Sequence, residues 1–375
     1  MKKALALFLF VNLLAGPGKA QTTSGWIPFE LPLYQICFPV LVNGHPANAR
    51  LFNAVPSGID KDFATAIGLT PTEKPAVNIQ LGALLLQEPV AAGVFLHAAA
   101  TPPNDVRLGE EVFKQCIVDI DFPNHAIAFY SPAGFSPPAG AVALAFTRQG
   151  DDRAVPIRVE DGPEKYYWVY LGDPTPLSLY DNFFGPLGIL NNRPVSVRQG
   201  GGPKKPPEAV ATIHELRLAG SAFKEIPAVL PADSVSGPHP AGVGGHIGVG
   251  LLNRFRVIVD YAHDRLYLIP GAASMVNAPF ARDRSGLVLR KTGQDYLVTF
   301  VCPGSPALKA GFRLGDTVTM VDARPLPALQ GVAWQTASHA KSAIGRSGVF
   351  RGESANEGRR LADRLFDSAA RCRCR

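Results

Sequence analysis

The 375-residue sequence has few cysteines, few charged residues and, after residue 20, no hydrophobic run long enough to cross a membrane. Its five cysteines form no Cys-x-x-Cys pair and no Cys/His spacing of a zinc site, so we expect no bound metal. Charged residues make up only 18% of the chain and hydrophobic residues 46%, which excludes an intrinsically disordered protein. By contrast, 37 glycines and 34 prolines favour many short strands and turns over long helices.

Two glycine-rich stretches lack the context of a cofactor site. Residues 200–205 do not end in the Gly-Lys-Ser/Thr of a phosphate loop. Residues 241–250 do not follow the strand and helix pattern that a dinucleotide site needs. We therefore expect no cofactor.

The positive charge of the chain lies at its two ends. The net charge is +6, of which residues 1–20 contribute +3 and residues 338–375 contribute +5, so the residues between them carry −2. A basic surface that binds nucleic acid is therefore not expected.

Residues 1–20 have the composition of a secretory signal peptide. Two lysines precede an apolar stretch from Ala4 to Ala15, and small residues follow it. This stretch is shorter than the roughly 20 residues that span a bilayer, so we expect cleavage and a periplasmic or secreted protein without an integral membrane span. In such a protein, Cys37 and Cys116 fit either a disulfide or two buried thiols.

Two segments, residues 38–69 and 155–189, share one pattern. Each has two strands joined by an Asn-Gly or Asp-Gly turn. Each continues with a tight loop and a short element that Asp60 or Asp181 is expected to cap. The pattern predicts two copies of one β unit.

The two copies also end alike. Residues 109–123 (GEEVFKQCIVDIDFP) and 250–270 (GLLNRFRVIVDYAHDRLYLIP) each place a glycine before a short helix and a strand. In their order and duplication these features resemble the retropepsin-like and pepsin-like aspartic peptidases, especially exported bacterial members with a C-terminal PDZ domain. The resemblance implies a mainly β, bilobal fold with an N-lobe at 21–150 and a C-lobe at 151–270. It also implies a monomer, because one chain supplies both lobes.

In that family each lobe supplies an Asp-Thr/Ser-Gly loop, and the two carboxylates share one proton while they activate water. Both motifs are degenerate here. The alignment places Phe52 and Tyr170 at the two catalytic positions; a shift by one residue puts Asn53 there instead of Phe52, and a carboxamide cannot transfer the proton. Asp173 is the fallback candidate for an acid, although an Asp before a proline is typical of a turn. No catalytic residue is therefore expected.

Residues 271–337 resemble the PDZ domains of exported bacterial proteases. The most specific part is Gly304-Ser305-Pro306-Ala307, followed by Leu314-Gly315-Asp316. By position, the residues that bind a peptide terminus would be Ser285, Gly286, Leu287 and Val288. The domain is expected to be incomplete, because residues 338–375 form an irregular basic tail that resembles out-of-frame translation. A genuine basic tail that contacts membrane or nucleic acid is the alternative.

The sequence thus predicts an exported protein that binds extended peptides or protein C-termini without cleaving them. The alternative is an active aspartic endopeptidase whose atypical loops hide the acids. A third possibility is a relic of the fold that binds no ligand.

Overall fold

The structure, a computed structural model, describes residues 22–70, 74–86, 90–95, 104–149, 152–198, 207–231, 239–282, 285–292, 295–318, 320–321, 324–325 and 349–350. The predicted signal peptide lies outside these residues, as does the predicted basic tail apart from residues 349–350. No helix among the described residues is long and apolar enough to cross a membrane.

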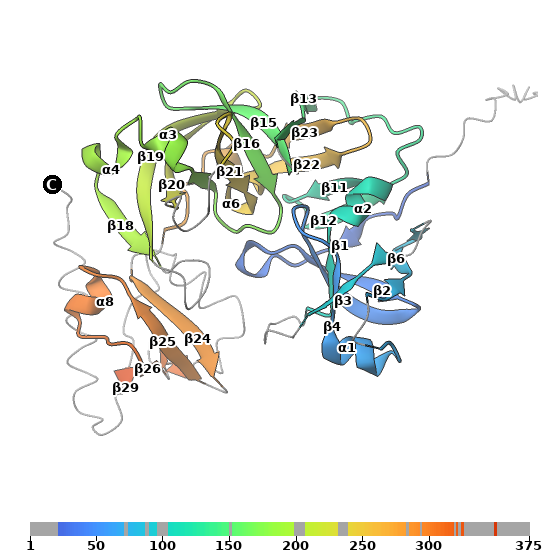
Figure 1. Cartoon of the computed structure of the whole chain (residues 1–375), viewed down its shortest axis with the longest axis horizontal. Helices are drawn as coiled ribbons and strands as arrows, with labels where there is room; N and C mark the ends of the chain where they lie inside the picture. The colour runs from blue at the N-terminus through green and yellow to red at the C-terminus, as the bar shows by residue number, and fades with distance from the viewer. Residues whose placement is uncertain are drawn as a thin grey trace, which may run out of the picture.

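The first lobe contains a seven-stranded sheet (Figure 1). In spatial order its strands are β7 (Leu84–Leu85), β6 (Ile79–Leu81), β2 (Cys37–Val42), β3 (His45–Leu51), β10 (Val106–Leu108), β4 (Gly58–Asp60) and β9 (Gly93–Phe95). Beside the sheet lie η1 (Pro32–Tyr34), α1 (Lys61–Ala66), α2 (Glu110–Gln115) and the paired strands β5 (Ala76–Val77) and β8 (Val90–Ala91).

The second lobe contains an eight-stranded sheet. In spatial order its strands are β14 (Thr147–Gln149), β15 (Asp152–Val159), β16 (Lys165–Tyr170), β21 (Val243–Gly248), β17 (Leu177–Leu179), β20 (Ser221–Leu230), β19 (Glu208–Leu218) and β18 (Val195–Arg198). Three short helices accompany it: α3 (Asp181–Phe184), α4 (Ile189–Asn192) and α6 (Val249–Leu252).

A six-stranded sheet joins the lobes. Its order is β1 (Ile27–Pro28), β12 (Ala126–Tyr130), β11 (Ile117–Asp121), β22 (Phe255–Asp260), β23 (Arg265–Pro270) and β13 (Val142–Ala145). The two copies of the repeat meet at its centre, where Val118 on β11 pairs with Val259 on β22.

The duplication predicted from the sequence is visible in the pairing of the strands. β10 pairs parallel with β3 and antiparallel with β4, and β21 pairs parallel with β16 and antiparallel with β17. The mainly β, two-lobed fold is therefore confirmed, while the predicted limits of the lobes stay predictions.

Local signals explain the start of each repeat. Asn43 and Gly44 both have positive φ, 50° and 83°, as a two-residue turn between β2 and β3 requires. Asp60 caps α1 as expected, since its carboxylate accepts from the backbone of Asp62 and Phe63. The expected cap Asp181 is wrong by one residue: Tyr180 precedes α3 and Asp181 is its first residue.

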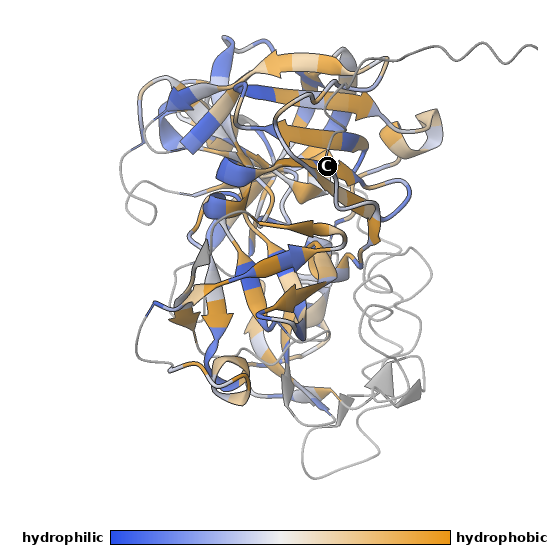
Figure 2. Ribbon diagram, turned by 90° about the vertical axis from the view of Figure 1, so that its right-hand side faces the viewer, coloured by the Kyte–Doolittle hydropathy of each residue, from blue (hydrophilic) through white to orange (hydrophobic). Residues whose placement is uncertain are grey.

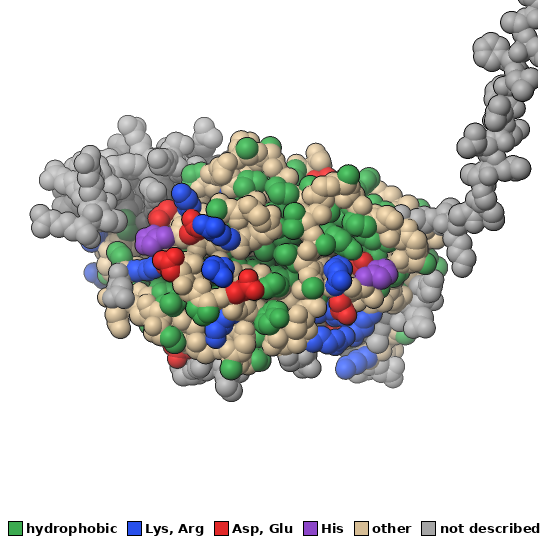
Figure 3. Space-filling model, turned by 90° about the horizontal axis from the view of Figure 1, so that it is seen from above, with side chains coloured by type: hydrophobic (Ala, Val, Ile, Leu, Met, Phe, Trp, Pro, Cys, Tyr) green, Lys and Arg blue, Asp and Glu red, His purple; other side chains and the backbone are tan. Residues whose placement is uncertain are grey.

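Hydrophobic residues run along the strands and polar residues gather in the turns (Figure 2). One core continues through both lobes, and its largest fully buried side chains include Phe38, Tyr167 and Phe255. On the face seen in Figure 3, acidic side chains lie beside basic ones, with hydrophobic side chains between the groups.

A C-terminal module, residues 285–325 and 349–350 where described, lies below β18 and β19 in Figure 1. It contains β24 (Leu287–Thr292), β25 (Asp295–Val301), α8 (Pro306–Lys309), β26 (Thr317–Val318), β27 (Met320–Val321), β28 (Arg324–Pro325) and β29 (Val349–Phe350). It has a core of its own, formed by Val298, Ala307, Ala310, Phe312 and Val318. Its identity as a PDZ domain stays a prediction.

Two arginines hold the connection to this module against the second lobe. Arg254 donates from Nη1 to the carbonyl oxygens of Met275, Val276 and Ala278, at 3.1, 2.7 and 2.7 Å. Met275 and Val276 belong to α7 (Ala273–Val276), so Arg254 satisfies carbonyls that end this helix. The guanidinium also stacks on Phe280, 3.8 Å from the ring centroid.

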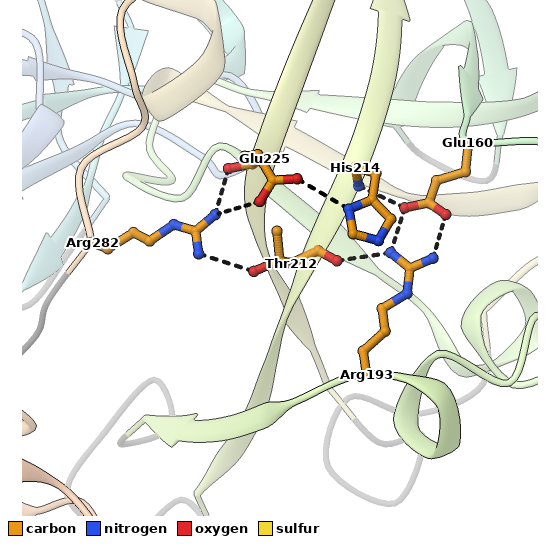
Figure 4. Close-up of polar contacts among 6 residues, drawn as sticks. All are labelled: Glu160, Arg193, Thr212, His214, Glu225 and Arg282. Atoms are coloured by element: carbon orange, nitrogen blue, oxygen red, sulfur yellow. Dashed lines mark hydrogen bonds and ion pairs between the residues drawn. The ribbon is translucent and has the colours of Figure 1, made fainter. Parts of the chain in front are cut away.

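Arg282 makes the second attachment (Figure 4). It donates from Nη2 to the carbonyl oxygen of Glu225 on β20 over 2.7 Å and from Nη1 to Oγ1 of Thr212 on β19 over 3.0 Å. Arg193 donates to the carbonyl oxygen of the same Thr212 over 2.8 Å and is ion-paired with Glu160. Arg282 therefore attaches the connection to the hairpin of β19 and β20. Arg193 and Glu160 stabilise the same hairpin from its other side.

Candidate functional site

The loops that follow β3 and β16 occupy equivalent places in the two lobes. Leu51 pairs with Leu108, and Val169 pairs with Ile247, and in each lobe a glycine follows the partner residue. The residues after Leu51 and Val169 are Phe52, just past the end of β3, and Tyr170, the last residue of β16. Phe52 and Tyr170 therefore stand at the same structural position. The alternative alignment, with Asn53 opposite Tyr170, lacks this symmetry.

Asn53 links the first loop to the second. Its Nδ2 donates to the carbonyl oxygen of Val169 over 2.6 Å and to the hydroxyl of Tyr261 over 3.0 Å. Its Oδ1 accepts from the backbone nitrogen of Leu171 over 2.8 Å. Asn53 is 7% exposed, so the carboxamide uses its donors and its acceptor inside the protein as a structural bridge.

Phe52 packs directly on Gly172 of the opposite loop. A Cβ placed on residue 172 would lie 2.1 Å from Cδ1 of Phe52 and 2.6 Å from its Cε1. Glycine is therefore required here by the close approach of the ring.

Tyr170 faces the same region from the second lobe. Its hydroxyl donates to Oδ2 of Asp152 over 2.9 Å, and its ring centroid lies 4.9 Å from that of His246. Burial, followed by the nearby Asp152 carboxylate, raises the pKa of Tyr170, so the phenol stays protonated.

The two loops line an open cleft of about 580 Å³ between the lobes. It is lined by Phe52, Asn53, Ala54 and Val55 of the first loop, by Tyr170, Gly172, Asp173, Pro174 and Thr175 of the second, and by Arg198 of β18. Most of the exposed lining is apolar, and a few polar side chains interrupt it. This composition is typical of a ligand-binding cleft.

Asp173 is the one carboxylate among these described lining residues. Its Oδ1 accepts from the nitrogen and the hydroxyl of Thr175, at 2.7 and 2.6 Å, and its Oδ2 lies 2.7 Å from Nε2 of His246. Burial acts to raise the pKa of Asp173, but the hydrogen bonds and the charge of His246, together with Thr175, lower it to about 2.

This environment determines what Asp173 can do chemically. An ionised carboxylate with such a low pKa is a poor proton donor, and its hydrogen bonds hold it in a turn over Pro174, as the sequence suggested. Its ionisable neighbour is a histidine, whereas a proton-sharing pair needs a second carboxylate. The described lining residues therefore supply no pair of acids.

The residues predicted to bind a peptide terminus lie at the start of β24, an edge strand. The carbonyl oxygen of Ser285 accepts from Ala307 of α8 over 3.1 Å, and that of Gly286 accepts from Cys302 over 2.7 Å. Gly286 has φ +73°, and a Cβ there would lie 2.3 Å from Cβ of Ser305. Leu287 and Val288 continue into β24, where they pair with β25. Whether this loop binds a peptide stays a prediction.

Among the described residues, no three side chains of His, Cys, Asp or Glu gather closely enough to hold a metal ion. Cys37 and Cys116 are both free and buried, which decides between the two alternatives left open by the sequence.

Sequence reasoning missed three residues of the site. The bridging role of Asn53 was hidden because its partners lie in the other lobe. His246 lies in the glycine-rich stretch 241–250, which the sequence suggested only as a rejected cofactor site, so nothing local pointed to its contact with Asp173. Arg198 had no local signal, because β18 joins the cleft only through its pairing with β19.

No known protein family matches the sequence, and no curated protein matches it either. Among solved structures, it is similar to the aspartic proteinase from Irpex lacteus, with a TM-score of 0.45 and 10% identity, over 68% of this chain and 100% of that one.

Proposed function

We propose that this protein is an exported, catalytically inactive relative of the aspartic peptidases that binds extended peptides in the cleft between its lobes. The observation that carries the proposal is the composition of the cleft floor. Phe52 and Tyr170 stand at the equivalent loop positions, and the carboxamide of Asn53 is engaged in holding the loops together. A cleft of this size without a pair of acids can hold a chain but cannot activate water as that family does.

The C-terminal module is proposed to bind the terminus of the same or another chain at Ser285 to Val288. Support comes from the positive φ of Gly286 and from the position of β24 at a sheet edge, where a peptide can add a strand. A matched pair of peptides, one with a free C-terminal carboxylate and one amidated, tests this part separately from the cleft.

Binding in the cleft is tested by titrating an unstructured peptide library against the protein, in fluorescence anisotropy. Ala54 is exposed and lines the cleft, so Ala54→Trp is expected to fill it and abolish saturable binding. Ala133 is also exposed but lies away from the cleft, and Ala133→Trp is the matched control. Unchanged binding by Ala54→Trp would reject the cleft as the site.

The alternative function is an aspartic endopeptidase with atypical loops. It is supported by the presence of one carboxylate, Asp173, in the lining of the cleft. The test is incubation with unfolded protein between about pH 3 and 6, with and without pepstatin. Turnover that pepstatin suppresses and Asp173→Asn abolishes would establish the endopeptidase and overturn the proposal. Intact substrate at every pH is the expected result.

A further inference from the structure

Three aromatic side chains of the second lobe gather beside the cleft. Trp168 and Tyr170 stand two residues apart on β16, so both point to the same face, with ring centroids 6.0 Å apart. Tyr180, just after β17, meets Trp168 edge to face at 5.6 Å. Tyr170 also lines the cleft, so the group is continuous with it.

The imidazole of His239 packs against two of these rings, Tyr180 and Trp168. It stacks on Tyr180 with centroids 3.5 Å apart and an angle of 6°, and it meets Trp168 edge to face at 5.8 Å. The backbone beside it is held in place, because the carbonyl oxygen of Pro240 accepts from the backbone of Val243 over 2.9 Å. His239 thus covers ring faces that a ligand would otherwise use.

Two carboxylates lie at the edge of this aromatic group. Asp152 accepts from the hydroxyl of Tyr170 over 2.9 Å. Asp173 is connected to Tyr180 through His246, whose Nδ1 lies 2.8 Å from the hydroxyl and whose Nε2 lies 2.7 Å from the carboxylate. After burial, the charges of Asp173 and Asp152 raise the pKa of Tyr180.

Aromatic faces next to carboxylates form an environment that attracts a cation, because the ring quadrupole and the negative charges act in the same direction. The nearby cation Arg198 does not oppose this, since its Nε and Nη2 both lie 2.9 Å from Oε2 of Glu208 and the pair is neutral. An acidic side chain would be repelled by Asp152, whereas the charge of Asp173 is already paired with His246.

We infer that Trp168, Tyr170 and Tyr180 form a subsite for a basic side chain, Lys or Arg, of a peptide bound in the cleft, and that His239 occupies this subsite in the free protein. The inference rests on the proposed function, since the peptide delivers the side chain through the cleft. It adds a preference among peptides and a contact within the chain that competes with the ligand.

The test uses His239→Ala and two peptides that differ only in one Lys or norleucine, titrated by isothermal calorimetry. Removal of the imidazole is expected to raise the affinity for the Lys peptide about tenfold and to leave the norleucine peptide within about twofold. Trp168→Leu in the same background is expected to abolish the difference between the peptides. His45→Ala, an exposed histidine of the first lobe, is the matched control.

A second variant tests the subsite without removing His239. Asp152→Asn leaves His239 in place and removes one carboxylate, so it is expected to weaken the Lys peptide severalfold and not the norleucine peptide. Equal affinity for both peptides in His239→Ala, with binding retained, would overturn the inference and leave the proposed function intact.

If no peptide binds any variant, the proposed function fails. The subsite is then tested by itself with single amino-acid derivatives. The probe is then Nα-acetyl-lysine amide against Nα-acetyl-norleucine amide, titrated into folded His239→Ala. Preferential binding of the lysine compound would support the subsite, and equal or undetectable binding of both would reject it.

Discussion

Asn53 Nδ2 donates to the carbonyl oxygen of Val169 over 2.6 Å and so joins the loop of one lobe to the loop of the other. The link is one-sided, because the equivalent residue of the second loop is Leu171, which offers only its backbone nitrogen to Asn53. One side chain therefore holds a contact that two related loops share. This makes the interlobe floor sensitive to a single substitution.

Asn53→Ala is expected to lower the free energy of unfolding by about 3 kcal/mol, because it leaves the Val169 carbonyl, the Leu171 nitrogen and the Tyr261 hydroxyl without this partner. Urea unfolding followed by circular dichroism measures it. Asn191 is exposed, so Asn191→Ala serves as the control and should change stability by less than about 0.5 kcal/mol. Similar values for the two variants would contradict the bridging role.

Gly172→Ala is expected to lower stability by about 2 kcal/mol, because its Cβ would collide with the ring of Phe52. In a Phe52→Ala background the same change should cost less than about 0.5 kcal/mol, since the ring is gone. At Gly93 the nearest atom to an added Cβ is 3.8 Å away, so Gly93→Ala is a matched control. Additive costs in the double-mutant cycle would show that the two residues do not interact.

Asp173 is expected to make stability fall in acid. Its pKa is about 2 in the folded protein against 3.8 for an ordinary Asp, so its stabilisation is present above about pH 4 and lost as the pH falls towards 2. The lost amount is about 2 kcal/mol. Chemical unfolding at pH 5 and pH 2.5 should show a steeper decline for the wild type than for Asp173→Asn. Parallel declines would mean that the folded pKa of this group is ordinary.

Arg282→Ala is expected to loosen the connection between the second lobe and the C-terminal module. The substitution removes the hydrogen bonds from Arg282 to Glu225 and Thr212, and each of these bonds contributes about 1 kcal/mol to stability. Hydrogen exchange should therefore become about tenfold faster in residues 273–282, while the core strands β11 and β22 keep their protection. Arg313 is exposed, and Arg313→Ala should leave the exchange of this segment unchanged.

Cys37 and Cys116 are expected to resist thiol reagents in the folded protein. Burial raises the pKa of Cys37 to about 11 and that of Cys116 to about 12, so almost no thiolate forms at pH 8. Labelling of these two thiols with a chromogenic disulfide reagent should be slow in buffer and rapid in urea, where all five cysteines of the chain should react. A total of three reactive thiols after unfolding would indicate a disulfide instead.

Local chemistry explains how much of the fold was predictable. Asn43-Gly44 determines a tight turn by its own backbone preferences, and Asp60 caps the helix that follows it in the chain. The predicted cap of α3, Asp181, was wrong by one residue, because the first residue of a short helix depends on packing as well as on its capping residue. The two copies of the repeat could be aligned because each contains the same succession of such local signals.

The candidate site was only partly predictable, for a different reason. That Phe52 and Tyr170 stand at corresponding loop positions follows from the alignment of the two loops, but the partners of Asn53 lie more than a hundred residues away in the sequence. Likewise, His246 meets Asp173 only because β21 pairs with both β16 and β17. Contacts of this kind depend on which strands pair and on how the two lobes pack together.

The sequence by itself determined the duplicated β architecture and the absence of acids at the paired loop positions, because short-range turn and strand preferences and residue identity suffice for both. Only the tertiary structure decided that Asn53 bridges the lobes, that Asp173 is held ionised beside His246, and that His239 packs against Trp168 and Tyr180. Each of these depends on side chains from separate strands meeting in one low-dielectric place, where a hydrogen bond or a charge acts only on the neighbours that folding supplies.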